Sequence, residues 1–230
     1  MKRFWKEVTA ALSDGAWQVA LDGRPVRTPA RAPLVLPTSA LAEAVAEEWR
    51  SCGETIDPRS MPLTGLANAA IDRVAPDPEA FAKSLSQYAA SDLFCYRAEF
   101  PVPLVEAQAE LWDPLLTWSR RRFDIDFSVT TGVLPIDQPP ATLTRLAHEV
   151  ARLSPFPLAA LAPLVTVGGS LVAALALLEG HVSTNEAWEA VSLDERWQLQ
   201  EWGSDAEAEK AMAARERDFR AGAKLLALLA

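Results

Sequence analysis

The sequence predicts an α+β protein in which a small β-rich N-terminal domain is followed by a larger, mainly helical C-terminal domain. Strand-like alternation of apolar and polar residues is concentrated near the N-terminus, whereas helical spacing dominates after residue 100. The length of 230 residues allows one large domain or two small ones, at about 150 residues per domain. We expect a β-rich domain with accompanying helices over residues 1–95 and a helical domain over residues 96–230.

The segment WQVALDGRPVRTPA at residues 17–30 predicts a β-hairpin. Apolar side chains at positions 17, 19 and 21 alternate with polar or small ones, which is the period of a strand with one buried face. Asp22 and Gly23 then form a tight-turn pair, because glycine tolerates positive φ. The residues LVL at 34–36, bounded by prolines, predict a third short strand.

Helical signals begin after the third strand. Ser39 is expected to cap a helix that has Leu41, Val45 and Trp49 on its apolar face and Gly53 at its end. The aromatic and apolar residues of segment 91–99 suit a strand or an extended arm. The alternating apolar residues of segment 123–129 predict a short strand. Further helices are predicted from apolar spacing around residues 66–74, 81–88, 104–118, 139–150 and 205–228. Capping-box spacing pairs Ser183 with Glu186 and Ser192 with Glu195.

The run LAALAPLVTVGGSLVAALALL at residues 158–178 is uncharged and about as long as a bilayer-spanning helix. Pro163 and the pair Gly168-Gly169 interrupt it, and no aromatic belt or Lys/Arg cluster flanks it. We therefore expect a buried helical hairpin and no membrane insertion.

The net charge is −9 and the pI about 4.8, so a nucleic-acid partner is not expected, because phosphate binding needs a basic face. Two cysteines exclude a disulfide scaffold, and with two histidines they are too few for a typical structural zinc site. Residues 179–230 are net acidic and residues 1–31 net basic. This asymmetry is compatible with a charged protein partner and equally with a solvated helical surface.

A survey for catalytic chemistry finds no nucleophile elbow, phosphate loop or dinucleotide fingerprint. Asp124 and Asp126 lie two residues apart and would share a face of a strand, but a solvated edge explains them more simply than a carboxylate pair. Cys95 lies between two aromatic residues and is expected to be a buried, inert thiol. We expect no catalytic residues, no metal and no cofactor.

Several motifs together resemble the ATP-synthase assembly factor twelve family, which are chaperones for the alpha subunit of the catalytic head of F-type ATP synthase. They occur in family order and cover nearly the whole chain. The motifs are WQVALDGRPVRTPA, LPTSALAEAVAEEW, IDPRSMPLTGLANAAID, SDLFCYRAE, QAELWDPLLTW, GGSLVAALALLEG and ERWQLQEWGSDAEA.

The resemblance implies a β-rich domain followed by a helical one, in a protein that is neither an ATPase nor dependent on a cofactor. Such a chaperone binds a newly made alpha subunit, shields its aggregation-prone interface and releases it to the beta subunit. The chain starts without a transit peptide, so we expect a bacterial member that acts in the cytoplasm and is monomeric when free.

The family's C-terminal motif assigns the expected client-binding residues: Glu195, Gln198, Glu201, Trp202, Asp205 and Glu207. For Glu195 the alternative is a role as the capping partner of Ser192. The motifs nearer the N-terminus supply residues with an expected structural role: Trp17, Asp22, Gly23, Arg24, Pro25, Trp49 and Arg97.

Two other classes of function stay open at this point. One is a general protein-interaction module with a different client, which an exposed apolar patch without affinity for ATP synthase subunits would indicate. The other is an enzyme with an unrecognised acid–base site, which a deep pocket with perturbed pKa values would indicate.

Overall fold

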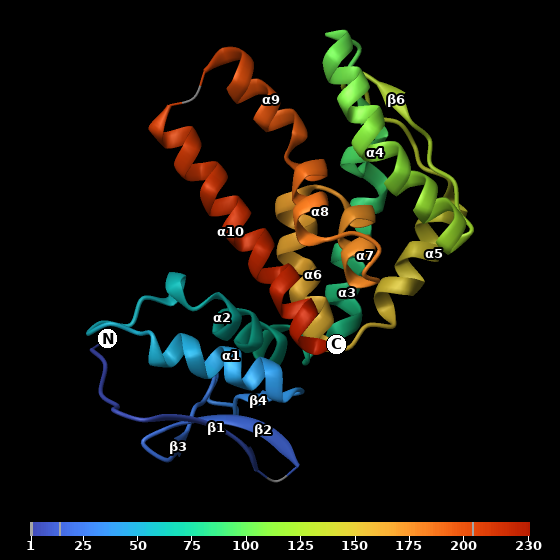
Figure 1. Cartoon of the computed structure of the whole chain (residues 1–230). Coiled ribbons are helices and arrows are strands. Elements are labelled where there is room, and N and C mark those ends of the chain that lie inside the picture. The colour runs from blue at the N-terminus through green and yellow to red at the C-terminus, as the bar shows by residue number, and fades with distance from the viewer. Residues whose placement is uncertain (1, 14, 204) are drawn as a thin grey trace. The chain divides into compact units, whose positions relative to one another are not determined.

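A computed structural model describes residues 2–13, 15–203 and 205–230 (Figure 1). The fold is α+β, with a small strand region followed by a mainly helical region, as predicted. Contacts divide the chain into two compact units. Unit 1 comprises Met1–Pro78, Ser154–Ala160 and Lys224–Ala230, and unit 2 comprises Glu79–Leu153 and Leu161–Ala223. The expected boundary between two domains at residues 95/96 stays a prediction.

Unit 1 contains a four-stranded antiparallel sheet. The strands are β1 (Val8–Ser13), β2 (Ala16–Leu21), β3 (Arg24–Pro25) and β4 (Val35–Leu36), with β2 pairing with each of the other three. The turn at Asp22 and Gly23 and the third strand of the prediction are confirmed as the β2–β3 turn and β4. Strand β1 was not predicted, because Val8 is its one buried residue and the alternation is weak.

Asp22 fixes the turn by a contact outside it. Both Asp22 and Gly23 have positive φ, at 48° and 76°, and the Asp22 Oδ1 accepts the backbone N–H groups of Lys6 and Glu7 at 3.0 and 2.8 Å. These two bonds lower the pKa of Asp22. The exposed residues Arg24 and Pro25 form the short return strand β3.

Helix α1 (Ser39–Arg50) covers one face of this sheet (Figure 1). Its cap is Thr38 and not Ser39, because the Thr38 hydroxyl accepts the N–H of Leu41 while donating to the carbonyl of Leu228 at 2.6 Å. The helix also ends at Arg50, before the expected Gly53.

The core of unit 1 forms where α1 meets β2 and β4. Its fully buried members include Val19, Leu36 and Leu41. Trp17 and Trp49 are half-buried and pack against this cluster, as their apolar positions in the sequence suggest. The remaining helical elements are η1 (Pro58–Ser60), α2 (Pro62–Ala69) and the π-helical η2 (Ala70–Val74).

Unit 2 is helical, and α6 and α10 contribute residues to both units. Its elements are α3 (Pro78–Ser86), η3 (Gln87–Ser91), η4 (Leu93–Cys95), β5 (Tyr96–Arg97), α4 (Val102–Phe123), β6 (Thr130–Thr131), α5 (Pro140–Ala151), α6 (Pro155–Gly168), α7 (Leu171–Leu178), α8 (Thr184–Val191), α9 (Leu193–Trp202) and α10 (Ala206–Leu229). The only strand pairing described here is the parallel ladder of β5 and β6.

Two strand predictions in unit 2 need correction. In the segment 91–99, Ser91 and Leu93–Cys95 are in 3₁₀ helices, and only Tyr96 and Arg97 are in a strand. The segment 123–129 is not a strand, because α4 continues to Phe123 and Asp124 then takes a left-handed conformation with φ 51°. The alternating apolar residues are in fact helix-end and loop anchors, with Phe123 and Phe127 buried.

The uncharged run forms two separate helices, α6 and α7, with a break at Gly169, where φ is 69°. Among the described residues, no helix combines the length and the hydropathy needed to cross a bilayer. Asp92 accepts the N–H of Val172 at 3.0 Å and the Ser170 hydroxyl at 3.1 Å, at the N-terminus of α7. Asp92 is fully buried, and this burial raises its pKa to about 6.

Replacing Asp92 by asparagine is expected to destabilise the fold by an amount that depends on pH. Because the folded-state pKa is raised from 3.8 to about 6, the stabilising contribution of Asp92 is present below 3.8 and is lost as the pH rises through 6. In urea unfolding, the loss caused by Asp92→Asn should be about 1–3 kcal/mol larger near pH 4 than near pH 7. An equal loss at both pH values would contradict this expectation.

Candidate functional site

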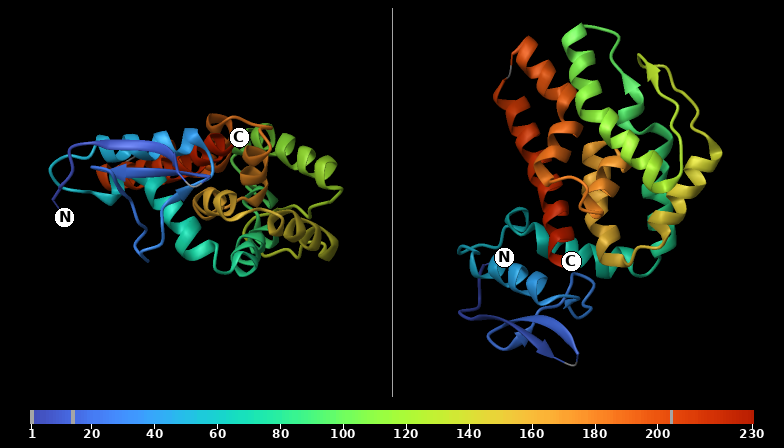
Figure 2. Two further views of the ribbon diagram at one scale, coloured as in Figure 1. Left: turned by 90° about the horizontal axis from the view of Figure 1, so that it is seen from below. Right: turned by 45° about the vertical axis from the view of Figure 1, so that its right-hand side comes forward.

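The six expected client-binding residues lie on α9, on the turn after it and on the first turn of α10. The two helices leave a common turn at one end of unit 2 (Figure 1; Figure 2, right). Gly203 ends α9 with a φ of 84°, a conformation that favours glycine. Residues 193–209 carry six acidic side chains and the single basic residue Arg196. The structure separates these acidic side chains into inward and outward groups.

Glu195 points inward and joins α9 to α10. The Glu195 Oε1 accepts a hydrogen bond from the Arg215 guanidinium, and Arg215 also donates to the carbonyl of Val167 at 2.7 Å. The expected capping box is wrong here, because the Ser192 hydroxyl donates to the carbonyl of Trp188 at 2.6 Å. By contrast, the capping box of Ser183 and Glu186 is confirmed.

A small cleft of about 220 Å³ lies between α9 and α10. Gln198 is exposed at its rim, and Leu199 and Met212 supply apolar wall. One oxygen of Glu195, Oε2, is buried without a hydrogen-bond partner in the described structure. The cleft is too small for a folded domain, so it suits at most one side chain of a partner.

Trp202 dominates the outward group. Its side chain is 81% exposed at the last residue of α9, whereas Trp188 is buried and packs on Phe219. Glu201 and Glu207 are exposed beside this turn, and the described structure shows no hydrogen bond or ion pair from either carboxylate. An exposed tryptophan with acidic neighbours is a common composition for a protein-binding surface.

Asp205 has a structural role at the same turn. Its carboxylate accepts the backbone N–H groups of Glu207 and Ala208 at 2.9 and 2.7 Å, which caps the N-terminus of α10. The expected site residues therefore divide into Glu195 and Asp205, which hold the helices, and Glu201, Trp202 and Glu207, which face solvent. Gln198 lies between these groups, at the cleft.

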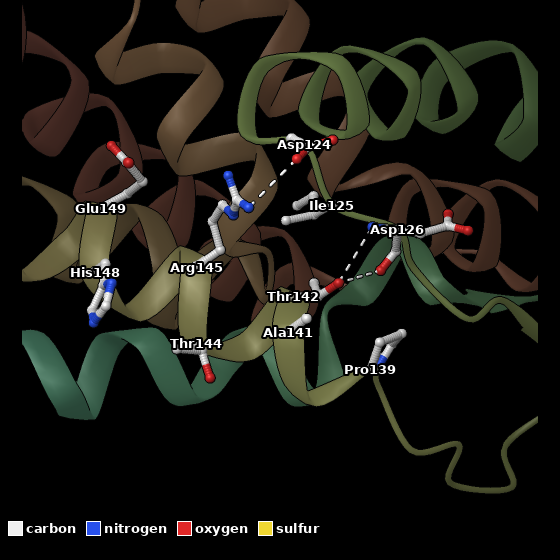
Figure 3. Close-up of a pocket in the computed structure, with 10 residues that line it drawn as sticks. All are labelled: Asp124, Ile125, Asp126, Pro139, Ala141, Thr142, Thr144, Arg145, His148 and Glu149. Carbon is white, nitrogen blue, oxygen red and sulfur yellow. Dashed lines mark hydrogen bonds and ion pairs between the residues drawn. The ribbon is translucent and has the colours of Figure 1, made fainter.

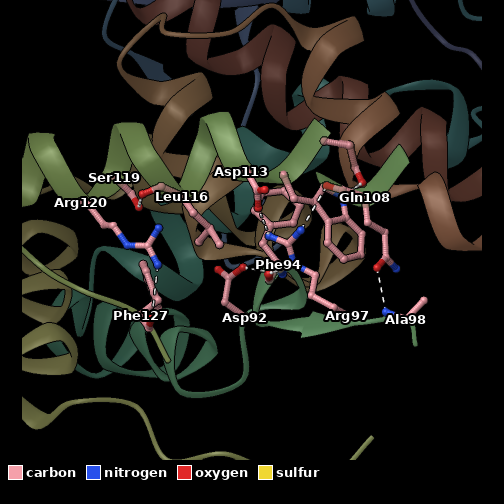
Figure 4. Close-up of polar contacts among 12 residues, drawn as sticks. Asp92, Phe94, Arg97, Ala98, Gln108, Asp113, Leu116, Ser119, Arg120 and Phe127 are labelled. Atoms are coloured by element: carbon pink, nitrogen blue, oxygen red, sulfur yellow. Dashed lines mark hydrogen bonds and ion pairs between the residues drawn. The ribbon is translucent and has the colours of Figure 1, made fainter. Parts of the chain in front are cut away.

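Arg97 organises the neighbouring core of unit 2 (Figure 4). Its side chain donates to the carbonyl of Phe94 at 2.9 Å, pairs with Asp113 at 2.7 Å and lies 5.1 Å from the ring centroid of Trp112. The side chain is 13% exposed. Since these partners belong to unit 2, the structural role expected for Arg97 has a direct physical basis.

Gln108 is a buried connector that the sequence reasoning missed. Its carbonyl oxygen accepts the N–H of Ala98 at 2.8 Å (Figure 4), and its amide donates to Asp194 of α9 at 2.7 Å. Burial raises the pKa of Asp194, although the bond from Gln108 acts in the opposite direction. The only available signal was the polar glutamine at an apolar position of the motif QAELWDPLLTW.

A cleft of about 860 Å³ lies between α5 and the segment after α4 (Figure 3). It contains Asp124 and Asp126, but each carboxylate is paired with an arginine: Asp124 with Arg145 at 3.4 Å and Asp126 with Arg120 at 2.7 Å. The bond from Arg120 lowers the pKa of Asp126. A general acid needs a raised pKa, so Asp126 does not have the properties of a general acid.

A second cleft, of about 820 Å³, is lined by Trp118 and His181, whose rings stack with centroids 4.9 Å apart. Cys95 is buried, as predicted, and burial raises the pKa of its thiol to about 12. Within the described residues, no group of three or more His, Cys, Asp or Glu side chains is placed to hold a metal ion.

This chain is similar to ATP12 chaperones in its sequence and in its structure. Residues 2–120 match the model of a family described as ATP12 chaperone protein. The protein atp12, mitochondrial, of Schizosaccharomyces pombe is 25% identical over 215 residues, covering 88% of this chain and 74% of that protein.

Solved structures agree with this match. The crystal structure of Atp12 from Paracoccus denitrificans has a TM-score of 0.93 and 45% identity, covering 100% of this chain and 98% of that one. A mutant of Paracoccus denitrificans Atp12p has a TM-score of 0.93 and 44% identity, with the same coverage.

Replacing Arg97 by lysine is expected to lower the free energy of unfolding by about 1–3 kcal/mol, because lysine keeps the charge but lacks the planar fork that reaches several acceptors. Arg121→Lys is the matched control, since Arg121 is an exposed arginine on α4 of the same unit. Its effect should stay within about 0.5 kcal/mol. Equal effects of the two substitutions in urea unfolding would argue against the proposed role of Arg97.

Proposed function

Because this chain belongs to the ATP12 chaperone family, we propose that it is an assembly chaperone that binds the unassembled alpha subunit of F-type ATP synthase. It shields the aggregation-prone interface of this client and releases it to the beta subunit while the catalytic head assembles. The client is the one that the sequence motifs imply by their resemblance to this family, and its site is the surface around Trp202.

The observation that carries the proposal is the exposed Trp202 with Glu201 and Glu207 beside it. Burying a tryptophan that is 81% exposed is a large apolar gain for a complex, and tryptophan is enriched among residues that dominate binding energy. The two carboxylates, which the described structure leaves without internal partners, are able to pair with basic side chains of a client.

The geometry also suggests how binding and release work. Glu195 with Arg215, and Asp205 at the cap of α10, hold both helices in place, so little order has to be gained on binding. Apolar contact supplies affinity, and charge supplies selectivity and speed of association. A beta subunit that binds the same client face more tightly is sufficient for release, so the cycle needs neither nucleotide nor cofactor.

We further propose that the protein is not an enzyme and works as a monomer in the bacterial cytoplasm. The Paracoccus relatives support a bacterial setting, while the fission yeast relative is named as mitochondrial. The paired state of Asp124 and Asp126 supports a role without acid–base catalysis.

Co-expression with the alpha and beta subunits of the cognate ATP synthase tests the proposal. We expect alpha alone to be retained with the tagged chaperone and to stay soluble, and added beta to displace the chaperone. Retention of neither subunit would contradict the proposed client and favour a general interaction module with a different one.

Substitutions at the turn are expected to weaken alpha binding without unfolding the chaperone. Trp202→Ala should raise the dissociation constant about tenfold or more. Glu201→Lys should weaken binding by reversing a charge, while the new cation at the C-terminal end of α9 is favourable for the helix. Glu207→Lys should weaken binding too, at a small cost to the N-terminus of α10.

Glu54→Lys is the control, because it makes the same charge change at an exposed position of unit 1. Titration of the chaperone with alpha, together with circular dichroism, separates binding from folding. Unchanged binding by folded Trp202→Ala and Glu201→Lys would remove this turn from the client site.

A further inference from the structure

Four large apolar side chains are exposed near the ends of β5 and β6 in unit 2. Phe100 is 76% exposed, Val102 65%, Val133 93% and Leu134 75%, and we call these four residues the apolar tip. Single exposed apolar residues are ordinary on a protein surface, whereas a group of them marks an interaction site.

The pairing of the two strands gathers them. β5 and β6 are parallel, with Tyr96 opposite Thr130 and Arg97 opposite Thr131. In a parallel ladder, the chain that follows each strand leaves at the same end. Phe100 and Leu134 each come three residues after the last paired residue. Figure 1 accordingly shows β6 alongside the beginning of α4.

The loop that carries Val133 and Leu134 is closed at its base. The buried side chain of Gln138 accepts the N–H of Ser128 at 3.0 Å and donates to the Ser128 carbonyl at 2.9 Å. Further along, the N–H of Gly132 donates to the carbonyl of Arg97 at 2.8 Å. The bonds of Gln138 therefore close the base of this loop, and the bond from Gly132 holds it beside β5.

The other half of the apolar tip lies at the start of a helix. Val102 is the first residue of α4, and the N–H of Leu104 donates to the carbonyl of Pro101 at 3.0 Å. The segment before it is held to α4 by the bond between Ala98 and Gln108. Because this backbone is already ordered, a partner gains the apolar contact without paying for the ordering of the chain.

Charge identifies the chemistry of the partner. Residues 98–110 and 128–138, which include the apolar tip, contain no lysine or arginine. Their charged residues are all acidic: Glu99, Glu106, Glu110 and Asp137. The complementary partner surface is therefore apolar at its centre and basic around it.

We propose that the apolar tip is a second docking surface for the client, which binds an apolar segment of the unassembled alpha subunit flanked by lysine or arginine residues. The inference rests on the proposed function and adds a contact to the one at Trp202. Figure 1 and the right view of Figure 2 place the start of α4 and the end of α9 at the same end of unit 2. One client face is thus able to engage both surfaces.

The test is a titration of the full-length chaperone with alpha subunit freshly diluted from denaturant. The variant Val133→Ser/Leu134→Ser should bind alpha about tenfold more weakly than the natural chain. Phe100→Ser should weaken binding in the same direction. Leu12→Ser is the matched control, because Leu12 is 60% exposed on β1 of unit 1, and it should leave the affinity unchanged.

A second arm uses charge. Glu99→Lys/Glu106→Lys should weaken alpha binding and reduce its dependence on salt concentration, whereas Glu54→Lys should do neither. Circular dichroism and thermal unfolding of each variant confirm that it is folded. A folded Val133→Ser/Leu134→Ser variant with natural affinity would overturn the inference.

The outcomes separate this inference from the proposed function. If the tip variants bind normally but Trp202→Ala does not, the second docking surface is wrong and the proposed function stands. If the natural chain does not bind alpha at all, the proposed function fails and the inference with it. If the natural chain is a dimer that the tip variants convert to monomers with unchanged alpha affinity, a second copy covers the tip and the inference is wrong.

Discussion

The buried amide of Gln108 is the contact on which the arrangement of unit 2 depends. It accepts a bond from the backbone after β5 and donates one to Asp194 on α9, so a single side chain on α4 links both segments that carry exposed apolar residues. An amide is suited to this position because it donates and accepts at once, and a leucine of similar size would leave two partly buried polar groups without these bonds. Arg97 of β5 strengthens the same junction by pairing with Asp113 of α4.

The acidic side chains of the C-terminal motif fall into two groups, one bonded to the protein and one facing solvent. Asp194, Glu195 and Asp205 satisfy groups inside the fold, whereas Glu201 and Glu207 face water next to Trp202. Under the proposed function, the protein has to bind its client firmly and then release it without a nucleotide cycle. Apolar contact on an ordered backbone supplies the affinity. The charges around it interact with the client less strongly when salt screens them.

Only part of the candidate site could be predicted from the sequence. The acidic motif around Trp202 was identified from the sequence, whereas the exposure of Trp202 was not predicted. The roles of Glu195 and Asp205 were not predicted either, because the spacing of Ser192 and Glu195 fits a capping box as well as it fits the observed pair with Arg215, twenty residues further along the chain. Similarly, the apolar tip combines segments about thirty residues apart, and no local pattern relates Phe100 to Leu134.

The sequence by itself determined the fold class, the turn at Asp22 and Gly23, the break at Gly169 and the last helix, because each follows from short-range periodicity or from glycine's access to positive φ. Tertiary structure alone decided that 123–129 is not a strand, that Thr38 caps α1 through a bond shared with Leu228, and that Asp92 is buried at the N-terminus of α7. The physical reason is the same in each case. Whether a segment forms a helix, a strand or a cap depends here on hydrogen-bond partners far away in sequence. Only the folded chain brings those partners within reach.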